Sequence, residues 1–113
     1  MAPQMLKTKK VDVLHCKGDL NAETMVPIRN RVEDLVNKNH KHMLLDLART
    51  KHVDLAGLGI LVDRIKDVRD HEGDIKLCHV SKTVQQTFRL VGLAKLVESF
   101  ETPEEAMRSF KVA

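Results

Sequence analysis

Residues 43–68, MLLDLARTKHVDLAGLGILVDRIKDV, decide the fold of this chain. The segment begins with a nearly continuous apolar run, Met43–Leu47, which is typical of a strand that helices cover on both faces. Its second half has apolar residues at helical spacing, which predicts a helix over Leu58–Val68. The junction Val53–Gly59 therefore joins a strand directly to a helix. The first N–H groups of such a helix lack partners within the helix, so an anion or a protein can dock there.

The flanking segments continue the alternation of strands and helices. A partly alternating pattern predicts a strand over Val11–Cys16, before a turn at Lys17–Asp19, and Gln4–Lys9 is a candidate short edge strand. Further strands are predicted at Ile75–Val80 and Leu96–Phe100. Strands that alternate with helices favour an α/β domain with a largely parallel or mixed sheet.

The first helix is predicted over Met25–Val36 from its apolar stripe. Pro27 is tolerable only near the first turn of a helix, so Thr24 is a better N-cap than Asn21. The helix over Leu58–Val68 should end at Gly73, which can adopt the left-handed conformation that follows many helices.

Two more helices are predicted in the C-terminal third of the chain. One is capped by Ser81 and stopped by Gly92. Its apolar face consists of three residues at helical spacing, Val84, Phe88 and Val91. The other begins at Thr102–Glu105, where a hydroxyl cap, a Pro at the first helical position and a Glu three residues after the cap form a capping-box pattern. This last helix is expected to run through Phe110.

The size and composition are those of one ordinary globular domain. The chain has 113 residues, of which 42% are hydrophobic and 31% are charged, so residues 1–113 are expected to bury one core without metals or disulfides. No apolar run approaches the roughly 18 residues that a membrane span needs, and Met1–Lys10 lacks the apolar stretch of a secretory signal. The protein is therefore expected to be cytoplasmic, with no membrane partner.

The charge pattern argues against a nucleic-acid partner. The net charge is only +3 and the two signs are interleaved, as in Asp63-Arg64 and Lys66-Asp67, which is typical of a solvated helix face. The chain has three Phe, no Tyr and no Trp, so it lacks the aromatic platforms on which single strands stack. Cys16 and Cys78 have no CxxC partner and are expected to be small buried hydrophobes in a reducing compartment.

No catalytic set is visible in the sequence. The six histidines are scattered over strand ends and polar loops, and none accompanies a nucleophile in a recognisable motif. His40 and His42 could face the same side of an extended segment, but zinc needs further ligands at suitable spacing. Gly57-Leu58-Gly59 lacks the remaining residues of a dinucleotide or phosphate loop, so both glycines are expected to permit a tight turn and a close backbone approach. We therefore expect no enzyme, no cofactor and no metal.

Several spaced motifs resemble the STAS-domain family of bacterial anti-sigma factor antagonists. The motifs are Gly18-Asp19-Leu20-Asn21, Leu45-Asp46-Leu47, Asp54-Leu55-Ala56-Gly57-Leu58-Gly59 and Val91-Gly92-Leu93. The resemblance extends over nearly the whole chain, and it implies a single α/β domain with a mixed sheet of four to five strands packed with about four helices. It also implies partner switching: an unphosphorylated antagonist binds an anti-sigma factor that is also a serine kinase, and so releases a sigma factor.

The chain departs from this family where the family is regulated. In the family, the kinase phosphorylates a Ser or Thr in the junction, usually Asp-Ser-Ser-Gly or Asp-Ser-Thr-Gly, and the added charge disrupts the complex. Here Asp54 and Gly57 match, but Leu55 and Ala56 occupy the acceptor positions and cannot accept a phosphate. Asn21 also stands where the family turn usually has an acid.

The resemblance therefore predicts a non-enzymatic regulator that binds an anti-sigma factor or a serine-kinase-type partner, without Ser phosphorylation at the junction. The predicted partner-binding residues lie in the turn and in the junction: Asp19, Asn21, Asp54, Leu55, Ala56, Gly57, Leu58 and Gly59. An exposed Leu55 would favour this docking surface, whereas a Leu55 that points into the core would favour a STAS fold without the ancestral partner.

Other interpretations stay open from the sequence. A switch could use another hydroxyl, with Thr50 the nearest and Ser81 and Thr83 further along the chain. The N–H groups of Gly57–Gly59 could instead hold a small anionic ligand, or the domain could act as a scaffold for a different partner. Extra apolar positions on the Met25–Val36 helix leave room for a weak homodimer.

Overall fold

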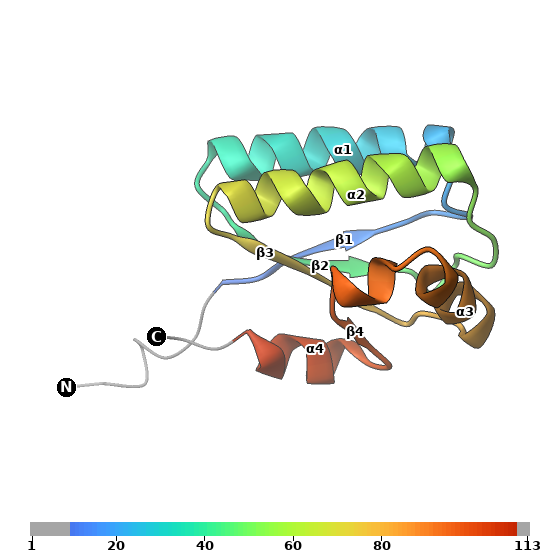
Figure 1. Ribbon diagram of the computed structural model, residues 1–113. Coiled ribbons are helices and arrows are strands. Elements are labelled where there is room, and N and C mark those ends of the chain that lie inside the picture. The colour runs from blue at the N-terminus through green and yellow to red at the C-terminus, as the bar shows by residue number, and fades with distance from the viewer. Residues whose placement is uncertain (1–9, 111–113) are drawn as a thin grey trace.

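The computed structural model describes residues 10–110, which contain a four-stranded sheet in the order β1-β2-β3-β4 with every neighbouring pair parallel (Figure 1). The strands are β1 (Asp12–His15), β2 (His42–Asp46), β3 (Asp74–Cys78) and β4 (Ser99–Phe100). The fifth strand expected at Gln4–Lys9 lies outside the described residues. The α/β architecture is as predicted, and all strand pairing among residues 10–110 is parallel.

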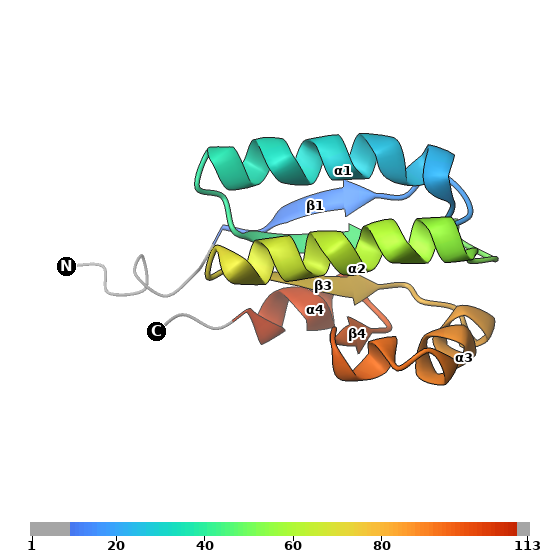
Figure 2. The ribbon, with the colours of Figure 1, turned by 45° about the horizontal axis from the view of Figure 1, so that its top comes forward.

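Helices cover both faces of the sheet. They are α1 (Ala22–Asn37), α2 (Leu55–Asp70), α3 (Lys82–Leu90) and α4 (Pro103–Ser109), with a short 3-10 helix, η2 (Leu93–Lys95), after α3. The long helices α1 and α2 pack side by side on one face (Figure 2), and α4 covers the other face (Figure 1). Among the described residues, no helix combines the length and the apolarity that crossing a bilayer requires.

The apolar runs of the sequence explain these layers. The predicted stripe of α2 is fully turned inward, since Leu58, Leu61, Ile65 and Val68 are all buried. In β2, alternate residues serve opposite cores: Met43 and Leu45 join the main core, and Leu44 packs with a second cluster beneath α4. Burial on both faces is the reason that this strand is almost continuously apolar.

The start of α1 differs from the prediction. Asn21, and not Thr24, is the N-cap: the Asn21 side chain accepts the Thr24 N–H at 2.9 Å. The Thr24 hydroxyl in turn accepts the Asn21 N–H at 3.1 Å, which completes a capping box. The helix therefore begins at Ala22, and Pro27 lies inside α1 rather than at its first position. The prediction of Thr24 as the N-cap was wrong because it relied on the position of Pro27 and overlooked the capping box that Asn21 and Thr24 form.

The end of α2 is another correction. Glu72, with φ of 63°, occupies the left-handed position, and Gly73 follows it. The N–H of Glu72 bonds the Arg69 carbonyl and the N–H of Gly73 bonds the Val68 carbonyl, both at 2.9 Å, in a Schellman arrangement. Gly73 is required for space instead, because a Cβ there would lie 2.3 Å from the Lys41 carbonyl oxygen.

The C-terminal third matches the predicted helices better than the predicted strand. Ser81 caps α3, Gly92 adopts a φ of 78° after it, and Thr102 caps α4 with Pro103 at its start.

The strand expected over Leu96–Phe100 is confined to its last two residues, because the N–H groups of Leu96 and Val97 bond the Leu93 carbonyl instead. Val91, expected on the buried face of α3, is half exposed beyond the last turn.

Candidate functional site

The turn before α1 and the junction before α2 lie side by side. Leu20 and Val53 form an isolated parallel bridge, in which the Leu20 N–H bonds the His52 carbonyl at 2.9 Å. The Asp54 N–H bonds the Leu20 carbonyl at 3.0 Å. These backbone bonds bring the two predicted halves of the docking surface, Asp19–Asn21 and Asp54–Gly59, into one site.

Gly57 is the contact point between the two segments. A Cβ at this position would lie 2.5 Å from the backbone nitrogen of Asn21 and from the carbonyl group of Leu20. Gly57 therefore permits the close backbone approach that the sequence predicted. Gly59 does not share this role, because a Cβ there would meet no atom within 4 Å. The expectation that both glycines allow a close approach was wrong for Gly59.

The helix at the junction begins three residues before the predicted start, at Leu55 rather than Leu58. Asp54 is its N-cap: the side chain accepts the Gly57 N–H at 2.8 Å, and its carbonyl accepts the Leu58 N–H at 2.9 Å. The Asp54 carboxylate therefore lies at the N-terminus of α2 and already accepts the Gly57 N–H, which a bound anion would need as a hydrogen-bond donor. The geometry therefore does not favour the anion-binding interpretation of Gly57–Gly59.

Asp19 ties the turn to the loop that precedes the junction. Its Oδ1 accepts the N–H groups of Lys51 and His52, each at 3.0 Å, and its Oδ2 lies 3.3 Å from Nδ1 of His52. The two backbone donors, Lys51 first and then His52, hold the pKa of the Asp19 carboxyl below its usual value of 3.8. Asp19 is thus primarily a positioning residue for this loop, with its side chain half exposed.

This network predicts a pH-dependent contribution of Asp19 to stability. A carboxyl whose pKa is depressed in the folded state stabilises the fold above its unfolded pKa, and the contribution is lost as the pH falls through the folded pKa. We expect Asp19→Asn to lower the free energy of unfolding at pH 7, and the difference from the wild type to shrink as the pH falls below about 4. Urea unfolding of both proteins at a series of pH values measures this, and a difference that stays constant down to pH ~2 would contradict it.

Thr50 is placed where a kinase cannot reach it in the folded protein. It is only 2% exposed, and its hydroxyl donates to the Gly18 carbonyl at 2.7 Å. Its backbone N–H donates to the Leu47 carbonyl at 3.0 Å, so both the side chain and the backbone of Thr50 hold the loop in place. This placement argues against Thr50 as a substitute phosphoacceptor.

Exposure separates the predicted site residues into two groups. Gly57 and Leu58 are buried and shape the start of α2 from within. Leu55 is 84% exposed at the first position of the helix, next to an exposed Ala56. The remaining predicted residues are exposed or half-buried: Asp19, Asn21, Asp54 and Gly59. An apolar side chain therefore projects from the junction instead of filling the core.

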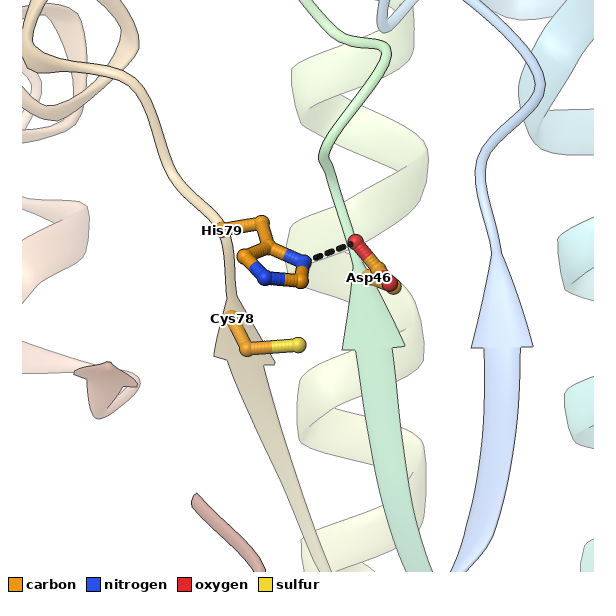
Figure 3. Close-up of side chains that lie close together, drawn as sticks. All are labelled: Asp46, Cys78 and His79. Atoms are coloured by element: carbon orange, nitrogen blue, oxygen red, sulfur yellow. Dashed lines mark hydrogen bonds and ion pairs between the residues drawn. The ribbon is translucent and has the colours of Figure 1, made fainter. Parts of the chain in front are cut away.

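Sequence reasoning missed a second cluster, at the carboxyl end of the sheet. Asp46, Cys78 and His79 come together there from the ends of β2 and β3 (Figure 3). Nδ1 of His79 lies 3.0 Å from Oδ1 of Asp46, and Nδ1 of His15, at the end of β1, lies 3.4 Å from Oδ2. The available signal was topological, because the carboxyl ends of parallel strands meet at one edge, where α/β sheets commonly bind ligands.

Comparisons with known proteins identify the family of the chain. The STAS domain model matches residues 2–106 of the chain. An anti-sigma F factor antagonist from Paenibacillus polymyxa is 22% identical over 96% of this chain and 94% of its own length. An anti-sigma-B factor antagonist from Listeria monocytogenes is 24% identical over 80% of this chain and 79% of its own length.

Solved structures show the same fold. The crystal structure of TM1081, a candidate anti-sigma factor antagonist from Thermotoga maritima, superposes with a TM-score of 0.79 at 26% identity and covers 88% of this chain and 86% of its own. The phosphorylated form of SpoIIAA from Bacillus superposes with a TM-score of 0.69 at 21% identity and covers 90% and 92%. With a family model that matches almost the whole length and a fold shared with these structures, the chain belongs to the STAS domain family.

Proposed function

We propose that this protein is a non-enzymatic anti-sigma factor antagonist that binds an anti-sigma factor of the serine-kinase type and thereby frees a sigma factor. The proposed docking surface consists of the exposed and half-buried residues of the turn and the junction, Asp19, Asn21, Asp54, Leu55, Ala56 and Gly59. Two bacterial antagonists are related to the chain over most of their length, which supports the same class of function here.

The observation that supports this proposal most directly is the exposure of Leu55. An apolar side chain that is 84% exposed at the start of a helix contributes little to its own fold, because it is not packed against the core. Burial of a Leu against a partner is worth roughly 1.5 to 3 kcal/mol. Leu55 thus offers binding energy that only a partner can realise, and it does so at the position where the family usually carries a phosphoacceptor.

The proposal also holds that the complex is not switched off by phosphorylation at the junction. Neither Leu55 nor Ala56 has a hydroxyl, and the hydroxyl of Thr50 is buried and bonded to Gly18. Control would then act on the partner, or on the amount of this protein. In a displacement assay, the protein should release sigma factor from its anti-sigma factor to the same extent with and without prior incubation with ATP.

Restoring a hydroxyl provides a direct test of the docking geometry. We expect Leu55→Ser or Ala56→Ser to become a substrate of a kinase-type anti-sigma factor, whereas the wild-type protein stays unmodified. Leu90→Ser is a matched control, because Leu90 is equally exposed, at 87%, but lies on α3. Intact-mass and peptide mass spectrometry after incubation with kinase and ATP measures the result.

Two outcomes would count against the proposal. Phosphate on wild-type Ser81, Thr83 or Thr50 would show that a switch exists at another site. Folded junction variants that bind the partner but are never phosphorylated would show that the junction is presented to the kinase differently from the family pattern.

A further inference from the structure

We propose that Asp46, Cys78 and His79 form a binding site for a zinc-class divalent cation at the carboxyl end of the sheet. One ligand atom of each residue, a carboxylate oxygen, a thiol sulfur and an imidazole nitrogen, lies within 4.8 Å of the other two. Ligands of a tetrahedral zinc ion are roughly 3.4 to 3.6 Å apart at normal bond lengths. The three groups therefore need only small side-chain rotations to share one ion.

The backbone geometry of β2 and β3 brings these three side chains together. Asp46 and Cys78 are directly paired across β2 and β3, so their side chains lie on the same face of the sheet. A regular strand would send the next side chain to the opposite face. His79 instead has a left-handed φ of 55°, which breaks the alternation, and its ring lies beside the thiol and the carboxylate (Figure 3). A positive φ is uncommon for residues other than Gly, and His is one of the residue types that adopt it more often than most.

Two carboxylates lie near the Cys78 sulfur, that of Asp46 on the neighbouring strand and that of Glu104 on α4. This negative surrounding favours a bound cation. A divalent ion would take up the sulfur as a thiolate, with release of the thiol proton to solvent.

The donor set selects the class of metal. Calcium and magnesium take oxygen ligands, whereas one oxygen, one nitrogen and one sulfur suit zinc or a neighbouring transition metal. Three protein ligands would leave a fourth position for solvent. The His79 side chain is 40% exposed, which gives an ion a route to this position.

His15 and Ala48 hold the carboxylate in place. The Ala48 N–H donates to Oδ1 of Asp46 at 2.9 Å, and Nδ1 of His15 lies 3.4 Å from Oδ2. In the metal-bound form, coordination would replace the contact between His79 and Asp46, and these outer contacts would persist. We therefore assign His15 as a positioning residue, and loss of such partners typically costs 10- to 100-fold in metal affinity.

Cobalt and zinc titrations of the full chain test the site. With Co²⁺ we expect one equivalent to bind with a sulfur-to-metal charge-transfer band and the visible bands of tetrahedral cobalt. Competition between Zn²⁺ and a chromophoric chelator gives the affinity. Cys78→Ser should abolish the charge-transfer band and weaken Zn²⁺ binding by more than about 100-fold, and His15→Ala by roughly 10-fold or more.

Two further variants separate the site from the fold. Cys16→Ser is the matched control, since Cys16 is also buried but its thiol donates to the Gly18 carbonyl, and this variant should keep the band. His79→Asn keeps a residue that tolerates the left-handed conformation and removes the imidazole, so it should fold and bind weakly. Absence of the band in the wild type, or equal Zn²⁺ affinity in the wild type and His79→Asn, would overturn the proposal.

Discussion

Replacement of Leu55 with Asp is expected to weaken binding of an anti-sigma factor partner by at least about 100-fold, because it removes the roughly 1.5 to 3 kcal/mol of a buried Leu and forces a carboxylate into the interface. The folded protein should hardly be affected. Leu55 is 84% exposed, and surface substitutions of this kind usually change stability by less than about 0.5 kcal/mol. Calorimetry or surface plasmon resonance measures the first effect, and thermal unfolding measures the second.

Leu90→Asp distinguishes a local effect from a general one. Leu90 is 87% exposed on α3 and lies outside the junction, so the same change of chemistry should leave partner binding within a few-fold of the wild type. Equal losses in both variants would show that the change in net charge, rather than the junction, governs binding. Unchanged binding of Leu55→Asp would remove Leu55 from the docking surface.

Gly57→Ala is expected to destabilise the fold by about 2 kcal/mol or more. The added methyl would lie 2.5 Å from backbone atoms of Leu20 and Asn21, and backbone cannot give way as the end of a flexible side chain can. Overpacking of this kind typically costs about 1 to 3 kcal/mol, and here it would also separate the turn from the junction. Equilibrium urea unfolding measures the change.

Gly59→Ala is the matched control for this prediction. Gly59 lies two residues later in the same helix, and a methyl group there meets nothing within 4 Å. Because Ala restricts the unfolded chain and favours a helix, Gly59→Ala should stabilise the protein by about 0.5 to 1 kcal/mol. Loss of stability in both variants to a similar degree would show that α2 needs flexibility at its start rather than space at Gly57.

Much of the fold could be predicted because its signals are local. The stripe of α2, the doubly buried β2 and the caps Ser81 and Thr102 each depend on residues close in sequence, so periodicity and capping chemistry were sufficient to identify them. The predictions that failed involved competition between local signals. At the start of α1, the capping box at Asn21 favoured one N-cap and Pro27 favoured another. After α2, Glu72 adopts the left-handed conformation, and Gly73 is needed because a Cβ there would clash with Lys41.

The site divides in the same way. The sequence, through the resemblance of its motifs, placed the junction and identified Leu55 and Ala56 as unable to accept a phosphate, because these are properties of adjacent residues. It could not show whether Leu55 faced the core or the solvent, because that depends on how α2 packs on the sheet. The exposed position of Leu55 and the contact of Gly57 with the Leu20 backbone were visible only in the tertiary structure.

The alternation of strands and helices, the position of the junction and the absence of a hydroxyl at Leu55 and Ala56 could all be predicted from the sequence, because each depends on neighbouring residues. The contacts between residues far apart in the sequence could be seen only in the folded structure. Cys78 lies 32 positions after Asp46 along the chain, and parallel pairing of β2 with β3 sets them opposite each other. The left-handed turn at His79 then adds its imidazole to this pair. The register of two strands cannot be predicted from their spacing along the chain, so this cluster could be found only in the folded molecule.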